Sequence, residues 1–212
     1  MRPWPLPERV LMQLVFVRHA LPVRADAGAD GIADPALSSL GERQSEPLVN
    51  ALRGQPFPEV TCSPAVRAVG TAGPFLQDRR LQPRIEPGLL EYSRPDRAYL
   101  PLHELRLEGG AEWEQIALGE LPAFVGGAAF QQRIVAAVED IVAHHPGRQS
   151  VLIVLSRRCH QSLPGPRAWD RARTGLSHRL CVDQPGLGRS RRPTNRAHGQ
   201  RDPARPGSAG LS

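Results

Sequence analysis

Apolar residues along the chain gather in short runs and in one long helical stripe. Continuous apolar runs in Gln13–Val17 and Val151–Val154 are typical of strands buried on both faces. Shorter runs predict strands at Glu59–Cys62 and Arg84–Glu86. Helical patterns alternate with these strands, and the clearest is the apolar stripe of Phe130–His145. This alternation predicts an α/β fold, a three-layer open sheet of mostly parallel strands flanked by helices.

Local start signals predict two further helices. Ser39 and Glu42 form a capping-box pattern for a helix over residues 39–53, and Pro47 should kink that helix or shift its start. Ser63-Pro64 predicts a second helix, with Ser63 as its N-cap and with Arg67 in its first turn.

Residues Ser93–Gly127 have mixed polarity and several Pro and Gly residues. They predict an excursion that covers the site, with a short helix around Glu112–Leu118.

Candidate chemistry lies where predicted strands end. Arg18-His19 follows the first strand, at the sheet edge where open α/β sheets bind ligands. Arg67, at a helix start, can hold an anion together with free backbone N–H groups, and Glu91 follows another strand. A carboxyl beside a phosphate should have a raised pKa, which suits a proton donor. Taken singly, His19, Arg67 and Glu91 each have a structural interpretation, but their joint placement favours a phosphoryl-transfer site.

Four motifs follow one another between residues 11 and 154. They are Arg18-His19-Ala20, Leu37-Ser38-x-x-Gly41-x-x-Gln44, Ser63-Pro64-x-x-Arg67-Ala68-x-x-Thr71-Ala72 and Leu89-x-Glu91. In this order they resemble the histidine phosphatase superfamily, the phosphoglycerate-mutase-like enzymes. The first motif has Ala where the family usually has Gly, and the second has Ser where Thr is commoner.

The resemblance implies a role for each site residue. His19 would attack phosphorus and become phosphohistidine, which water then hydrolyses. Arg18 and Arg67 would hold the phosphoryl oxygens, and Glu91 would protonate the leaving oxygen. The resemblance implies a small phosphorylated metabolite as partner and neither a metal nor another cofactor.

The family contains phosphatases and phosphomutases. We expect a phosphatase, because the covering segment is short and has no basic cluster suited to a second phosphate. Arg94 and Arg97 are the nearest candidates for substrate contact, with a solvated loop as the alternative. A phosphoglycerate-mutase-type phosphotransferase and a non-catalytic binder of a phosphorylated ligand remain the rival functions.

The family pattern breaks after the last apolar run. The family has a second His directly after this strand, whereas the chain continues Leu155-Ser156-Arg157-Arg158-Cys159-His160. His160 lies too far past the strand to fill that role. Arg, Pro and Gly dominate from Ser156 onward, so we expect an α/β domain over residues 11–155, incomplete at its C-terminal part, and a disordered tail over 156–212. Loss of the second His predicts impaired activity.

A shifted reading frame would explain the break. With suitable synonymous codons, reading Leu155–Gln161 from the second nucleotide gives Cys-His-Gly-Gly-Val-Ile-Asn, which resembles the missing motif. We therefore hypothesise a one-nucleotide insertion near codon 155.

The charge of the chain is concentrated in that tail. Residues 1–155 hold 15 Arg and 18 acidic residues, a net charge of −3, whereas residues 156–212 hold 12 Arg and 3 Asp, a net charge of +9. With Trp169 as its one aromatic residue, the tail does not predict specific nucleic-acid binding. The three Cys suggest no disulfide framework or metal site, and no apolar run approaches the ~20 residues of a membrane span. The sequence thus predicts a cytoplasmic protein without a membrane partner.

Overall fold

The fold is built on a parallel β-sheet, seen in a computed structural model that describes residues 12–93, 97–145, 149–163 and 176–181. The described strands are β1 (Met12–Arg18), β2 (Val60–Cys62), β3 (Pro83–Ile85), β4 (Gln149–Leu155) and β5 (Leu176–Cys181). Their order is β3-β2-β4-β1-β5, and every pairing among them is parallel. All five carboxyl ends therefore point to one edge of the sheet.

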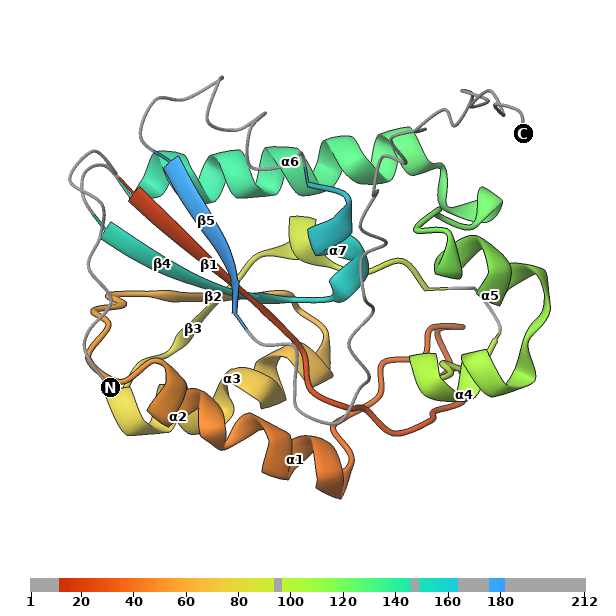
Figure 1. The fold of residues 1–212 in the computed structure, drawn as a ribbon, viewed down its shortest axis with the longest axis horizontal. Coiled ribbons are helices and arrows are strands. Elements are labelled where there is room, and N and C mark those ends of the chain that lie inside the picture. The colour runs from red at the N-terminus through yellow and green to blue at the C-terminus, as the bar shows by residue number, and fades with distance from the viewer. Residues whose placement is uncertain (1–11, 94–96, 146–148, 164–175, 182–212) are drawn as a thin grey trace, which may run out of the picture.

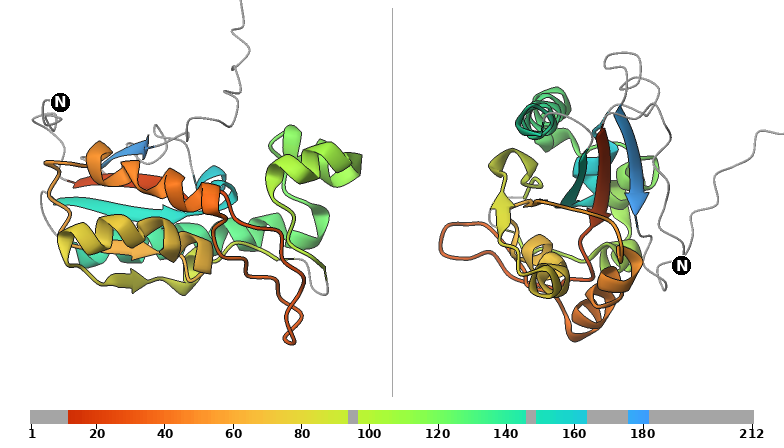
Figure 2. Two further views of the ribbon diagram at one scale, coloured as in Figure 1. Left: turned by 90° about the horizontal axis from the view of Figure 1, so that it is seen from below. Right: turned by 90° about the vertical axis from the view of Figure 1, so that its left-hand side faces the viewer.

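Helices cover both faces of the sheet (Figures 1 and 2). One face carries α1 (Ser39–Ser45), α2 (Pro47–Ala51) and α3 (Val66–Arg79), and the other carries α6 (Gly127–His144). The remaining helical elements are α4 (Leu102–Glu108), α5 (Gly110–Ala117), α7 (Arg157–Gln161) and the 3-10 turns η1 (Pro87–Leu89) and η2 (Ala123–Val125). The expected three-layer α/β architecture is confirmed. None of the helices in the described part of the chain is long and apolar enough to cross a bilayer.

The excursion that the sequence predicts between β3 and α6 contains two helices, α4 and α5, rather than one. Both lie beyond the carboxyl ends of the strands (Figures 1 and 2). They therefore lie over the edge where parallel sheets bind ligands.

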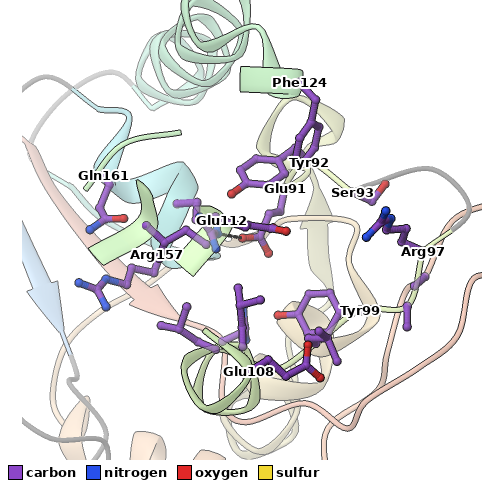
Figure 3. Close-up of a pocket in the computed structure, with 18 of the residues that line it drawn as sticks. Glu91, Tyr92, Ser93, Arg97, Tyr99, Glu108, Glu112, Phe124, Arg157 and Gln161 are labelled. Carbon is purple, nitrogen blue, oxygen red and sulfur yellow. Dashed lines mark ion pairs between the residues drawn. The ribbon is translucent and has the colours of Figure 1, made fainter. Parts of the chain in front are cut away.

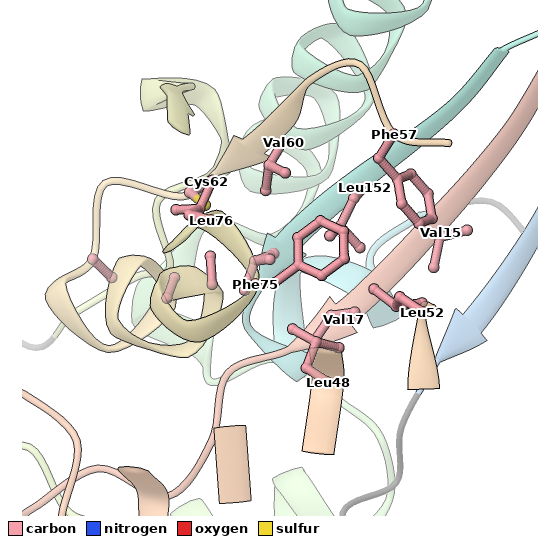
Figure 4. Close-up of a cluster of buried hydrophobic side chains, with 14 residues drawn as sticks. Val15, Val17, Leu48, Leu52, Phe57, Val60, Cys62, Phe75, Leu76 and Leu152 are labelled. Carbon is pink, nitrogen blue, oxygen red and sulfur yellow. The ribbon is translucent and has the colours of Figure 1, made fainter. Parts of the chain in front are cut away.

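The alternation of side chains along the central strands produces two apolar cores. In β1, Leu14 and Phe16 face α6, whereas Val15 and Val17 face α2 and α3. The second core also contains Phe75 of α3, and Figure 4 shows its ring among the side chains of the sheet. Burial on both faces explains why the central strands read as continuous apolar runs.

The start of the first helix differs by one residue from the prediction. Ser38, rather than Ser39, is the N-cap of α1, and its Oγ accepts a hydrogen bond from the Gly41 N–H at 3.0 Å. Pro47 has the expected effect, because the helix breaks there and α2 begins with Pro47 at its first position.

The third helix also starts later than Ser63-Pro64 suggests. Its N-cap is Ala65, whose side chain has no oxygen to accept a hydrogen bond. The carboxylate of Asp34 supplies the missing acceptor, since both of its oxygens lie within 3.2 Å of the Val66 backbone nitrogen. The helix start is therefore completed by a loop 32 residues earlier in the chain.

Regular structure continues past residue 155, where the sequence analysis ends the domain. Ser156 caps α7 by accepting the Cys159 N–H at 3.2 Å, and Cys159 itself is buried in the core beneath α6. Beyond this helix, β5 pairs with β1 along its length. The expectation of irregular chain from Ser156 is thus wrong for these two segments. The Ser156 cap and the buried Cys159 side chain anchor α7, and pairing with β1 orders β5. The rest of the predicted tail lies outside the described residues.

Candidate active site

Strand β1 delivers His19 to the edge of the sheet. Its backbone N–H donates to the Leu155 carbonyl at 3.0 Å, which extends the β1–β4 pairing by one residue. The His19 side chain is buried, and its Nδ1 lies 2.9 Å from the Ala20 carbonyl oxygen. A carbonyl only accepts, so Nδ1 carries the proton and the lone pair belongs to Nε2.

A chain of hydrogen bonds joins the end of β1 to the first turn of α3. The Ala20 N–H donates to Thr71 Oγ1 at 2.9 Å, and the Thr71 hydroxyl donates to the Arg67 carbonyl at 2.7 Å. Two of the recognised motifs are therefore in direct contact, and the position of His19 is tied to that of Arg67.

The motif around Ser38 holds the next residue of the same loop, Leu21. The Leu21 carbonyl accepts from the Ser38 N–H and Oγ, both at 3.0 Å, and the Leu21 N–H donates to Gln44 Oε1 at 3.1 Å. Gly41 packs so closely here that a Cβ would overlap the Leu21 carbonyl. This motif thus fixes the loop after His19 rather than supplying a reactive group.

Arg67 is buried and lies at the centre of an ion-pair cluster. Its Nη2 donates to Glu91 Oε2 at 2.8 Å and its Nη1 to Asp34 Oδ1 at 3.1 Å. Its guanidinium also lies 4.7 Å from the centre of the Tyr99 ring. The Tyr99 backbone forms two hydrogen bonds with Ala25, so the loop after β1 and the excursion are joined beside the site.

Glu91 is buried between two guanidinium groups. Arg67 approaches one oxygen at 2.8 Å, and Arg158 Nε approaches the other at 3.5 Å. Burial alone would raise the pKa of the carboxyl, but Arg67, His19 and Arg158 outweigh it and hold the pKa below its usual value. The sequence analysis expects a raised pKa for Glu91 when a phosphate lies beside it. Without phosphate, the neighbouring cations lower the pKa of Glu91 instead.

His19 has the electrostatic state of a nucleophile. Burial lowers the pKa of the imidazole to about 4, and the cations of Arg67 and Arg18 act in the same direction against the attraction of Glu91. The ring is therefore neutral at pH 7, with the Nε2 lone pair available.

These residues border a pocket of about 320 Å³ at the carboxyl edge of the sheet. Four of the candidate site residues line it, namely Arg18, His19, Glu91 and Arg97. Arg67 does not line it but contacts Glu91 from behind. Figure 3 shows Glu91 close to Tyr92, with Tyr99 on the opposite side of the pocket. Arg94, the other predicted substrate contact, lies outside the described residues.

Sequence reasoning missed Asp34, Tyr99 and Arg158 as members of this site. Asp34 lies in a loop rich in Ala, Gly and Asp, and Arg158 lies in the stretch that we expected to be irregular. No local pattern distinguishes them, because their roles come from the tertiary contacts with Arg67 and Glu91. His160 does not line the pocket, and its ring packs edge-on against Phe16 at 5.4 Å. Among the described residues, no three His, Cys, Asp or Glu side chains come together as metal ligands would.

A parallel α/β sheet with an imidazole, guanidinium groups and a carboxyl at its carboxyl edge is the arrangement of a phosphate-handling α/β protein. Comparison with known proteins gives the family. The histidine phosphatase superfamily (branch 1) matches residues 14–163. The chain therefore belongs to the histidine phosphatase superfamily. A search of curated proteins found no match.

Several solved structures share the fold of this chain. A phosphoglycerate mutase from Bacillus anthracis str. Sterne has a TM-score of 0.54 at 18% identity, covering 77% of this chain and 82% of its own. YhfR from Bacillus stearothermophilus has a TM-score of 0.55 at 20% identity, covering 76% and 80%. A mycobacterial glucosyl-3-phosphoglycerate phosphatase has a TM-score of 0.50 at 20% identity, covering 73% and 76%. At these identities the likeness concerns the fold.

Proposed function

We propose that the chain is a metal-free phosphomonoester hydrolase that forms a phosphohistidine on His19. The observation that carries the proposal is the state of this imidazole. It is buried beside Arg18 and Glu91, its Nδ1 is engaged by the Ala20 carbonyl, and its pKa is about 4. A neutral imidazole with a free Nε2, in a pocket bordered by cations, suits attack on a phosphate ester.

In the first step, the Nε2 lone pair attacks phosphorus and the P–O bond to the leaving group breaks. The electron pair of that bond goes to the leaving oxygen, which takes a proton from Glu91. Glu91 must carry that proton at this point, although the pKa of the carboxyl is lowered in the chain alone. A phosphate dianion beside it supplies the opposing negative charge that raises the pKa.

In the second step, water attacks the phosphorus of phosphohistidine and the P–N bond breaks. Its electron pair returns to Nε2, Glu91 accepts the proton of the water, and inorganic phosphate leaves. Both steps concentrate charge on the phosphoryl oxygens, so they depend on nearby guanidinium groups.

Arg18 and Arg67 are the proposed clamp for these oxygens. Arg18 lines the pocket, while Arg67 lies behind Glu91. Protonation of Glu91 removes one of the two carboxylate charges that hold Arg67, and this frees Nη2 for the phosphoryl group while Asp34 keeps Nη1 in place. The Nε–H of Arg67 supports this role, because it is buried and has no hydrogen-bond partner among the described residues.

Arg158 is the proposed replacement for the family's second His. The family pattern would put that His at or beside position 156. In this chain position 156 is Ser156, the buried N-cap of α7. Two residues further on, Arg158 lines the pocket, with its Nε 3.5 Å from Glu91 Oε1. A flexible guanidinium supplies the charge of the missing group without its fixed geometry. We therefore expect activity that is present but reduced.

Turnover of p-nitrophenyl phosphate tests the proposal. We expect hydrolysis that His19→Ala abolishes and that Arg158→Ala lowers by about tenfold or more. A chain with the reading frame restored after residue 155 should gain on the order of a hundredfold, since it regains a fixed phosphate-binding donor. Arg53→Ala is the control, because Arg53 forms an exposed contact with Asn50. Hydrolysis that survives His19→Ala would contradict the proposal.

A non-catalytic phosphate binder is the second candidate, favoured by Ser156 at the second-His position. For a binder, phosphate would raise the melting temperature without turnover. A phosphoglycerate-mutase-type activity needs a holder for a second anionic group. The pocket offers little support for a second anionic group. Its further cations, Arg97 and Arg157, are accompanied by the carboxylates of Glu108 and Glu112, which repel an anion.

A further inference from the structure

Apolar side chains line a large part of the pocket beyond the reactive groups, together with the polar side chains of Ser93, Arg97, Glu108, Glu112, Arg157 and Gln161. We call Tyr92, Leu102, Leu105, Ile116 and Phe124 the apolar wall, and all five line the pocket. They come from the excursion between β3 and α6, which brings α4, α5 and η2 over the edge of the sheet. The reaction at His19 does not require apolar side chains at this place, although Tyr92 also packs against the core beneath α6.

The apolar wall begins directly at the proposed proton donor. Tyr92 follows Glu91 in the chain, and its ring lies edge-on to Phe124 at 5.7 Å. A second edge contact to Phe130 at 5.6 Å joins the Tyr92 ring to the core (Figure 3 shows Tyr92 between Glu91 and Phe124). Because Glu91 is the proposed donor to the leaving oxygen, we expect the group attached to that oxygen to lie near the Tyr92 ring.

Helix α4 adds two leucines to the apolar wall. Leu102 and Leu105 are three residues apart, so they share one helix face, and both line the pocket while remaining partly exposed. Leu107 on the same helix is 84% exposed and does not line the pocket. Partly exposed apolar side chains around a cavity gain free energy when an apolar ligand covers them.

The size of the pocket limits the ligand. At about 320 Å³ the pocket lies at the lower end of the range of about 300–1,000 Å³ for small-molecule sites. A phosphoryl group occupies part of this volume. We infer that the substrate is a phosphate monoester of a small apolar alcohol or phenol, with one ring or a short branched chain as its leaving group. This inference rests on the proposed function, because the proposed reaction defines the leaving group.

Binding of two phosphonates tests the inference without turnover. Benzylphosphonate and methylphosphonate carry the same anionic head, and calorimetry on the unchanged chain should give the benzyl compound at least about tenfold higher affinity. Leu105→Ser should remove most of that preference, whereas Leu107→Ser should keep it. Equal affinities for the two phosphonates in the unchanged chain would overturn the inference, whether or not Leu105→Ser folds.

Turnover separates this inference from the proposed function. Benzyl phosphate and methyl phosphate both release alkyl alcohols, and we expect kcat/KM to favour the benzyl ester by at least about tenfold. Equal kcat/KM values for the two esters, with turnover that depends on His19, would contradict the substrate inference but support the hydrolase. A preference for the benzyl compound in binding, without His19-dependent turnover, would contradict the hydrolase but support the apolar binding pocket.

Discussion

Arg67 donates a 2.8 Å hydrogen bond from Nη2 to Glu91 Oε2, and the two side chains are only 5% and 8% exposed. The pair joins the first turn of α3 to the segment after η1. Nearby, Asp34 and Arg158 extend it to a cluster of two carboxylates and two guanidinium groups. Both members of the pair act electrostatically on His19, Glu91 raising the pKa of the imidazole and Arg67 lowering it.

Removing the Glu91 charge should destabilise the chain at neutral pH. Glu91→Gln leaves Arg67 buried with Asp34 as its charged partner, and we expect a loss of about 2 kcal/mol in the free energy of unfolding at pH 7. The pKa of Glu91 is lowered in the fold, so the charge stabilises above the unfolded value of about 4.3 and is lost as pH falls through the folded value. Urea unfolding at several pH values from 7 to 3 measures the loss at pH 7 and its dependence on pH. At pH 3 the free energy of unfolding of the variant should approach that of the unchanged chain. A difference that does not depend on pH would contradict the ion-pair account.

The buried imidazole of His19 should also lower the stability of the chain in acid, over a higher pH range. The pKa of His19 falls from 6.5 to about 4 on folding, so between these values the unfolded chain binds a proton that the folded chain does not. Stability therefore falls as pH drops from 6.5 to 4, by about 3 kcal/mol in total. Since His19→Gln cannot take up the proton, its stability relative to the unchanged chain should rise by that amount over this range. Parallel pH profiles for the two chains would show that His19 titrates normally.

Asp34 should affect activity although it does not line the pocket. It accepts from Arg67 Nη1 at 3.1 Å and from the Val66 N–H, so it positions both the guanidinium and the helix start. We expect Asp34→Ala to lower kcat/KM about tenfold, because Arg67 loses a partner that positions it. Asp34→Asn should give a kcat/KM between those of the unchanged chain and Asp34→Ala, because its amide oxygen still accepts a hydrogen bond. Asp30→Ala is the matched control, since Asp30 accepts from the Ile32 N–H within the same loop. Equal losses for both alanine variants would point to the loop rather than to Arg67.

Gly41 should tolerate no side chain. A Cβ there meets the backbone of Leu21, two residues after His19, and Gly41→Ala should cost at least about 2 kcal/mol of unfolding free energy. Gly127→Ala is the control, because its Cβ would make an ordinary contact with Leu121 and should change stability by no more than about 1 kcal/mol. Thermal unfolding of the two variants measures the contrast. A small loss for Gly41→Ala would show that the loop after β1 can shift.

The sequence predicted well which strands carry the site residues, because the end of a strand is set by neighbouring residues in the chain. The run into Arg18-His19 and the strand before Ser156 are both where the pattern puts them. Pro47 breaks the helix, and α6 differs from the predicted stripe mainly by starting at Gly127. In each case neighbouring residues determine the outcome.

The failures involve contacts between distant segments. Ser63 does not cap α3. The first N–H of this helix, that of Val66, donates instead to Asp34 from another loop. The carboxyl of Glu91 has a lowered pKa because Arg67 and Arg158 converge on it from different elements. Helix α7 was not expected, since its composition is polar and only Cys159 is buried in the core. Such arrangements depend on the folded geometry and leave no periodic signal in the sequence.

The central claim is that His19 carries the phosphoryl group. The direct measurement is mass spectrometry of the peptide containing His19, after mixing the chain with p-nitrophenyl phosphate and quenching in alkali, where phosphohistidine survives. The account predicts one added phosphoryl group on His19, absent in the His19→Ala variant. Hydrolysis of the ester with His19 unmodified at every quench time, or with the phosphoryl group on another residue, would contradict it.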